Sequence, residues 1–134
     1  MARKQTRTAA TPVTVDRIAQ LLEALNTIDG LDWVEDAWVE KAPANYGVLE
    51  LIGESMGDYA DGIKIAQRLR VRLTAYVSGG SHHWVAAVQS VLDSLQLVYT
   101  MPQREYLQDI NKVSWMWEVY IRTPVVWTEA AANG

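Results

Sequence analysis

The stretch that decides the fold of this chain is IKIAQRLRVRLTAYV, residues 63–77. Apolar side chains dominate its odd positions, and Lys64, Arg68, Arg70 and Arg72 stand at even ones. Since successive side chains of a strand point to opposite faces, the alternation predicts one strand with an apolar face and a cationic face. Fifteen residues at about 3.3 Å each extend roughly 50 Å, well beyond the usual five or six residues. A small domain cannot cover such a strand, so we expect it to bend or to project as a hairpin arm that other subunits cover.

Amphipathic helices are predicted on both sides of this strand. In residues 14–28 apolar side chains recur every three or four positions, with Thr14 as the expected N-cap and Asp29-Gly30 as the expected end. In residues 81–95, Ser81 is the expected N-cap, and one face collects apolar side chains, namely Trp84, Val85, Val88, Val91, Leu92 and Leu95. We expect both apolar faces to pack on the sheet.

The other strands are predicted from shorter patterns. Residues 32–40 and 46–52 are predicted to form a hairpin, and the glycine- and acid-rich residues 53–62 to form a loop. Residues 97–101 and 113–121 predict two more strands, of which Pro124 is expected to close the last. This order predicts an α+β fold, in which an antiparallel-rich mixed sheet with a long projecting strand or hairpin carries two packed helices. The strand order stays open, and a parallel crossover through the second helix is an alternative.

The length of 134 residues suits one domain, and the apolar and charged fractions of 49% and 21% are those of a globular protein. We expect a flexible basic N-terminal arm at residues 1–13, carrying Arg3, Lys4 and Arg7, then one domain at 14–122 and a C-terminal tail at 123–134. No apolar run approaches the roughly 20 residues that a membrane span needs. The absence of cysteine excludes disulfides, thiolate nucleophiles and zinc-thiolate sites.

Charge is segregated along the chain although its net value is only −4. Residues 29–61 hold nine acids and one lysine, whereas residues 62–72 hold four cations and no acid. Such blocks can bring opposite patches of neighbouring subunits together, or can be solvated faces.

No residue set predicts catalysis, a metal site or a cofactor. The adjacent His82 and His83 would point about 100° apart on a helix and make a poor chelating pair, and capping accounts for Ser81. The expected interface residues are instead the cations Lys64, Arg68, Arg70 and Arg72 and the tryptophans Trp33, Trp38 and Trp127. Filling a core that lacks Phe is an equally good explanation for the tryptophans.

Several patterns together resemble a known family. They are the predicted first helix and Trp- and Tyr-bearing hairpin, the segment GDYADG at residues 57–62, the strand RLRVRLTAYV at 68–77, the helix at 83–95 and the closing strand WMWEVYI at 115–121. In this layout, over residues 14–122, the chain is similar to the tail terminator (tail completion) proteins of long-tailed, siphovirus-like bacteriophages. Head-tail connector and tail tube proteins have similar sequence patterns.

The resemblance implies a structural virion protein without catalytic residues, assembled in the host cytoplasm. It implies a hexameric ring that caps the tail tube protein, joins it to the head-tail connector proteins and has passing contact with DNA. The cationic strand residues would then face a neighbouring subunit or the lumen, and residues 53–62 would meet the tube. The alternative function is a nucleic-acid-binding module that uses the basic strand 64–72 together with the N-terminal arm.

Overall fold

The computed structural model describes residues 11–14, 16–38, 41–79 and 82–128, and their side chains except at 11–14, 55–57 and 126–128. Within these residues it contains two helices and seven strands, in the order β1 Thr11–Thr14, α2 Arg17–Leu25, β2 Asp32–Glu35, β3 Tyr46–Ala60, β4 Ile63–Val77, α3 His83–Ser94, β5 Val98–Tyr99, β6 Gln103–Leu107 and β7 Lys112–Thr128. Neither described helix is long and apolar enough to span a membrane.

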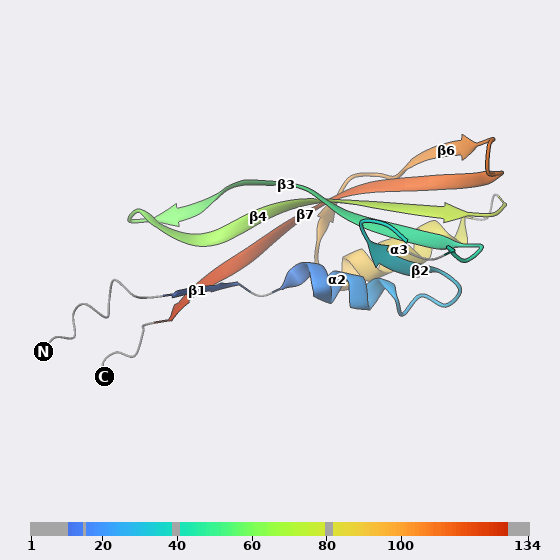
Figure 1. Ribbon diagram of the computed structural model, residues 1–134. Coiled ribbons are helices and arrows are strands. Elements are labelled where there is room, and N and C mark those ends of the chain that lie inside the picture. The colour runs from blue at the N-terminus through green and yellow to red at the C-terminus, as the bar shows by residue number, and fades with distance from the viewer. Residues whose placement is uncertain (1–10, 15, 39–40, 80–81, 129–134) are drawn as a thin grey trace, which may run out of the picture.

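One mixed, mostly antiparallel sheet holds all the described strands, in the order β1-β7-β4-β3-β2, and β5 and β6 pair with other parts of β7 than β1 does. The two helices lie together along one half of it (Figure 1). The predicted α+β class is therefore confirmed. The crossover from β4 through α3 ends in β5. Strands β4 and β5 both pair antiparallel with β7, so β5 runs parallel to β4, but β7 lies between them.

Strand β4 has the bounds that alternation predicts, Ile63–Val77. It forms a hairpin with β3 through Asp61 and Gly62, which both have positive φ angles, of 52° and 77°. Paired positive φ angles characterise the turn that best matches the twist of a hairpin. The prediction of a loop at residues 53–62 is wrong, because β3 continues to Ala60.

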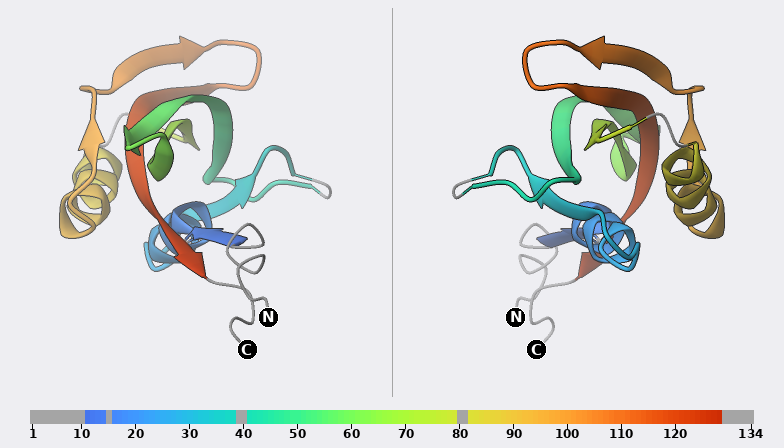
Figure 2. Two further views of the ribbon diagram at one scale, coloured as in Figure 1. Left: turned by 90° about the vertical axis from the view of Figure 1, so that its left-hand side faces the viewer. Right: turned by 90° about the vertical axis from the view of Figure 1, so that its right-hand side faces the viewer.

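The core lies between the helices and the odd-numbered face of β4 and β7. From β4 it takes Val71, Leu73, Ala75 and Val77, all fully buried, and from β7 it takes the predicted alternating set Val113, Trp115, Trp117, Val119 and Ile121. The predicted apolar face of α3 packs here too, with Val88 and Leu92 buried. The end-on views of Figure 2 show α2 and α3 next to each other, with β7 running from beside β6 at one end of the molecule to beside β1 at the other.

Helix α2 begins and ends at residues other than those predicted. Its N-cap is Asp16, whose carboxylate accepts a hydrogen bond of 2.9 Å from the Ala19 amide, while Thr14 belongs to β1. The helix ends at Leu25 with Asn26 as C-cap, before the predicted Asp29-Gly30. The Asn26 side chain explains the early end, because it bonds both the N–H and the C=O of Trp33 in β2, at 2.8 and 3.1 Å. The Asn26 side chain thus makes the two hydrogen bonds to Trp33 that a neighbouring strand would make at this edge of the sheet.

The connections in the sheet also correct several predictions. Strand β2 pairs parallel with β3, so residues 32–52 do not form a hairpin. Of the predicted strand at 97–101, only the two residues of β5 form a strand. Strand β6 is not among the predicted strands, and β7 continues past Pro124, its expected end. The expected domain boundaries, after residues 13 and 122, fall inside β1 and β7. Residues 1–10 and 129–134 lie outside the described part of the chain. Helix α3 has His82 as N-cap, and Ser81 also lies outside the described residues.

A tryptophan and a glycine fix the junction of β2 and β3. Trp33 is only 3% exposed, and its partner in the parallel register is Gly47. A Cβ atom added to Gly47 would overlap the indole ring of Trp33, so the core needs glycine at this position.

We therefore expect Gly47→Ala to lower the free energy of unfolding by about 2–3 kcal/mol, since displacing a packed indole overfills the core. Urea denaturation measures this value. Gly53→Ala in the same strand is the matched control, because a Cβ there would meet no atom within 4 Å. Equal denaturation midpoints for the two variants would contradict this packing.

Candidate functional site

The distal half of the β3–β4 hairpin leaves the helix-covered core. We call residues 53–70 the hairpin arm, and Figure 1 shows it extending away from both helices. On its odd-numbered face Ile63 and Ile65 are 52% and 41% exposed, whereas Val71 on the same strand is fully buried. Strand β7 pairs with β4 only from Ala66 onward, so the tip of the arm has two strands. The apolar face of β4 therefore continues beyond the part that its own helices cover.

Arginines follow the opposite face of the arm. The register places Arg68, Arg70 and Arg72 of β4 across from Arg122, Tyr120 and Glu118 of β7, respectively. On the β3 side, Gly53 lies opposite Arg70, and Glu50 opposite Arg72. The structure thus brings three of the four predicted cations into one row and adds Arg122, which the sequence patterns do not single out. The fourth, Lys64, is half-buried at the tip opposite Tyr59.

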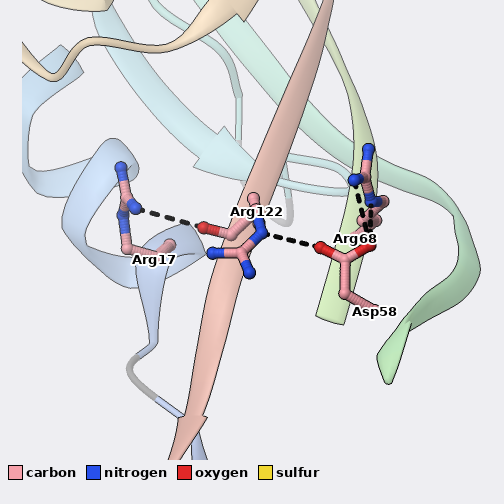
Figure 3. A network of polar contacts seen from close by, with 4 residues as sticks. All are labelled: Arg17, Asp58, Arg68 and Arg122. Carbon is pink, nitrogen blue, oxygen red and sulfur yellow. Dashed lines mark hydrogen bonds and ion pairs between the residues drawn. The ribbon is translucent and has the colours of Figure 1, made fainter. Parts of the chain in front are cut away.

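Asp58 joins two arginines from different strands (Figure 3). Its carboxylate accepts hydrogen bonds from Arg68 at 3.0 Å and from Arg122 at 2.7 Å. Bulges in the β3–β4 register between Ser55 and Tyr59 let this carboxylate reach the arginine row. Hydrogen bonds from Arg122 and then Arg68 hold the pKa of Asp58 below its ordinary value of 3.8. The three groups tie the arm to β7.

Arg17 extends this network toward the helices. It donates to the main-chain carbonyl of Arg122 at 3.4 Å and to that of Leu95, after α3, at 3.5 Å. One side chain at the start of α2 therefore links β7 and the end of α3. Figure 3 shows its contact with Arg122.

Arg72 lies nearer the body and is half-buried. Within the described residues its Nε atom is buried without a hydrogen-bond partner. Glu50 and Glu118 lie opposite Arg72 on the two neighbouring strands. The Tyr120 hydroxyl donates to Glu118 at 2.9 Å, and this bond raises the pKa of Tyr120.

A groove of about 740 Å³ opens at the base of the arm. Its charged lining comes from Arg68, Arg70, Arg122 and one acid, Glu54, and its exposed apolar lining comes from Val98 and Tyr120. We call it the arginine groove.

The tryptophans predicted as contact residues differ in position. Trp33 is a core residue, so that prediction is wrong for an intact subunit. Trp38 is half-buried and meets Tyr46 edge to face at 6.2 Å between ring centroids, and Tyr46 stacks on Tyr76 at 4.9 Å. Trp127 lies in β7 opposite Pro12 in β1, but its side chain is outside the described part. So are Arg3, Lys4 and Arg7.

The histidines have packing roles. His82 contacts the indole of Trp115 edge to face, with 5.5 Å between the ring centroids. The rings of His83 and Trp84 have their centroids 4.2 Å apart. In the described residues no group of three or more His, Asp or Glu side chains is placed to hold a metal ion. Neither a protein-family model nor a curated protein sequence matches the chain.

The link through Asp58 predicts a pH-dependent arm. Because the folded-state pKa of Asp58 is lowered, its stabilising effect is complete above pH 3.8 and is lost as the pH falls through the lower folded value. We expect Asp58→Asn to speed amide hydrogen exchange in residues 58–66 at neutral pH, with little change in the midpoint of global unfolding, since exposed ion pairs contribute little.

The difference between the wild type and Asp58→Asn should vanish in acid, where the wild-type carboxyl is also neutral. Asp109→Asn, an exposed acid in the turn before β7, is the control and should leave exchange in the arm unchanged. A wild type and an Asp58→Asn variant with the same arm protection at pH 7 would show that Asp58 does not tie the arm to β7.

Proposed function

We propose that this protein is a structural assembly subunit that forms a ring, and that the ring completes a bacteriophage tail by capping the tail tube and joining it to the head. The observation that carries the proposal is the hairpin arm, whose apolar face is left open by the subunit's own helices. Exposed apolar surface on an extended hairpin is a site where further protein binds, or else a liability for aggregation.

The exposed isoleucines support assembly more than they support catalysis. Leu51, Ile63 and Ile65 are each more than 40% exposed on the odd-numbered face of the hairpin, which continues the core face of β4. Covering this surface with a second subunit would complete a core that a single copy leaves unfinished. Repetition of one such contact around an axis closes a ring.

The phage role rests on the resemblance in layout over residues 14–122. The observed α+β sheet, long hairpin and paired helices agree with the fold that the resemblance implies. Under this proposal the ring is hexameric, its partners are the tail tube protein and head-tail connector proteins, and it resides in the virion.

Nucleic-acid binding is the alternative, and four arginines on one face of the sheet favour it. The same face carries acids, however: Asp58 binds Arg68 and Arg122, and Glu50 and Glu118 flank Arg72. Phosphate binding would have to displace these carboxylates or use Arg70 alone, so the structure favours protein partners.

Assembly can be tested by exchanging the exposed isoleucines for acids. We expect Ile63→Glu with Ile65→Glu to weaken ring formation by at least about thirtyfold, because each half-exposed isoleucine that becomes covered contributes about 1–2 kcal/mol. Light scattering with mass determination measures the assembled fraction, with and without tail tube protein, and electron micrographs show whether it is a ring.

The matched control is Met101→Glu with Ile110→Glu, which alters two exposed apolar residues outside the arm and should leave assembly unchanged. A wild-type chain that stays strictly monomeric both alone and with tail tubes would end the proposal. Salt-sensitive binding to duplex DNA by such a monomer would support the alternative.

A further inference from the structure

Within the described residues, one cation of the arginine groove has no ion-pair or hydrogen-bond partner. Arg68 and Arg122 are held by Asp58, but Arg70 is exposed, and no ion pair or hydrogen bond engages it among the side chains that the structure describes. Arg70 lies between Gly53 and Tyr120, the two residues opposite it in the sheet. The groove therefore offers an available guanidinium beside apolar walls.

The space beside Arg70 is open because its β3 partner is a glycine. A Cβ at Gly53 would meet no other atom within 4 Å, so no contact inside the subunit requires the missing side chain. Across the groove, Val98 is 68% exposed and Tyr120 is 41% exposed. A matching ligand is an extended protein segment that carries carboxylates for Arg70 and apolar atoms for these walls.

The chain itself contains a segment that offers such carboxylates. Residues 29–36, which we call the acidic segment, hold four exposed carboxylates, those of Asp29, Asp32, Glu35 and Asp36. In the described residues none of these carboxylates takes part in an ion pair or hydrogen bond. By contrast, the exposed Asp93 accepts a 2.8 Å hydrogen bond from Tyr99. The acidic segment includes β2, an edge strand of the sheet.

A subunit cannot place the acidic segment in its own groove. Pairing with β3 fixes Glu35 opposite Leu49, four residues before Gly53 on that strand. At about 3.3 Å per residue this offset is roughly 13 Å, well beyond an ion pair. Figure 1 shows β2 under the helix-covered half of the sheet, away from the arm.

We infer that the arginine groove of one copy receives the acidic segment of the next copy, head to tail. The inference rests on the proposed ring assembly and adds a second contact to it, on the face of the hairpin opposite the exposed isoleucines. Because the two surfaces are different and lie apart on one subunit, each copy can use both at once. Repetition of such a heterologous contact leads to a closed ring when the rotation per subunit permits.

Charge reversal on each surface tests this pairing. Arg70→Glu on one chain, and Asp32→Lys with Glu35→Lys on another, should each weaken self-assembly at least tenfold, as measured by light scattering at low salt. Neither change touches a buried residue or the Asp58 network, so both chains should fold, which circular dichroism verifies. An equimolar mixture should assemble again, because each altered surface then finds a complementary one on the other chain.

A steric variant gives a second test that does not depend on charge. Gly53→Leu should fold normally, since its side chain extends into open space, but it should fill the groove and weaken assembly at least tenfold. Gly53→Ala is the smaller control and should retain assembly.

The outcomes separate this inference from the proposed function. If the wild type forms rings and all these variants form them equally well, the pairing is wrong and the ring stands. If the two charge variants are impaired but their mixture does not recover, the groove binds something other than the acidic segment, and the pairing is again wrong. If Arg70→Glu leaves assembly intact but abolishes salt-sensitive binding to a DNA duplex, the occupant of the groove is nucleic acid.

Discussion

The structure depends on a mismatch between the length of β4 and the lengths of the helices that cover it. Fifteen residues of strand extend about 50 Å, whereas helices of nine and twelve residues are only about 14 and 18 Å long. The helices consequently bury the stretch from Val71 to Val77 and leave the other end of the strand uncovered. Three strands run side by side only up to the pairing of Ala66 with Pro124, and beyond it β3 and β4 continue alone. An isolated two-stranded hairpin is marginally stable in water, so this arm gains from contact with another protein.

Local polar contacts compensate for the missing cover. Asp58 binds arginines of β4 and β7, and it does so because bulges in the hairpin turn its carboxylate toward them. At the opposite edge, the amide of Asn26 takes the place of a strand beside Trp33. The Asp58 contacts hold the uncovered arm on β7 and leave Arg70 available to a partner, whereas the Asn26 contacts close the edge of the helix-covered half.

The sequence predicts those parts of the fold in which one side of an element is buried. Alternation gives β4 with its correct bounds and the inward residues of β7, and helical periodicity gives the inward face of α3. It misses the distal half of β3, because glycines and acids there resemble a loop, although Asp61-Gly62 is a recognisable hairpin turn. The parallel pairing of β2 depends on Asn26 and on the fit of Trp33 over Gly47, which are contacts between separate elements. For the same reason the sequence yields the arginine row on β4 but not Asp58 or Arg122, and it cannot assign Trp33 to the core.

One face of β4 changes from buried at Val71 to solvent-exposed at Ile65 within six residues. The chain has no cysteine, so single substitutions allow thiol labelling without background. We predict that the thiol of Ile65→Cys reacts with a maleimide at the rate of an exposed cysteine in the free subunit and far more slowly in the assembled ring, whereas that of Leu73→Cys is unreactive in both. Equally slow labelling at positions 65 and 73 in the free subunit would contradict the account, because the subunit would then cover the whole strand by itself.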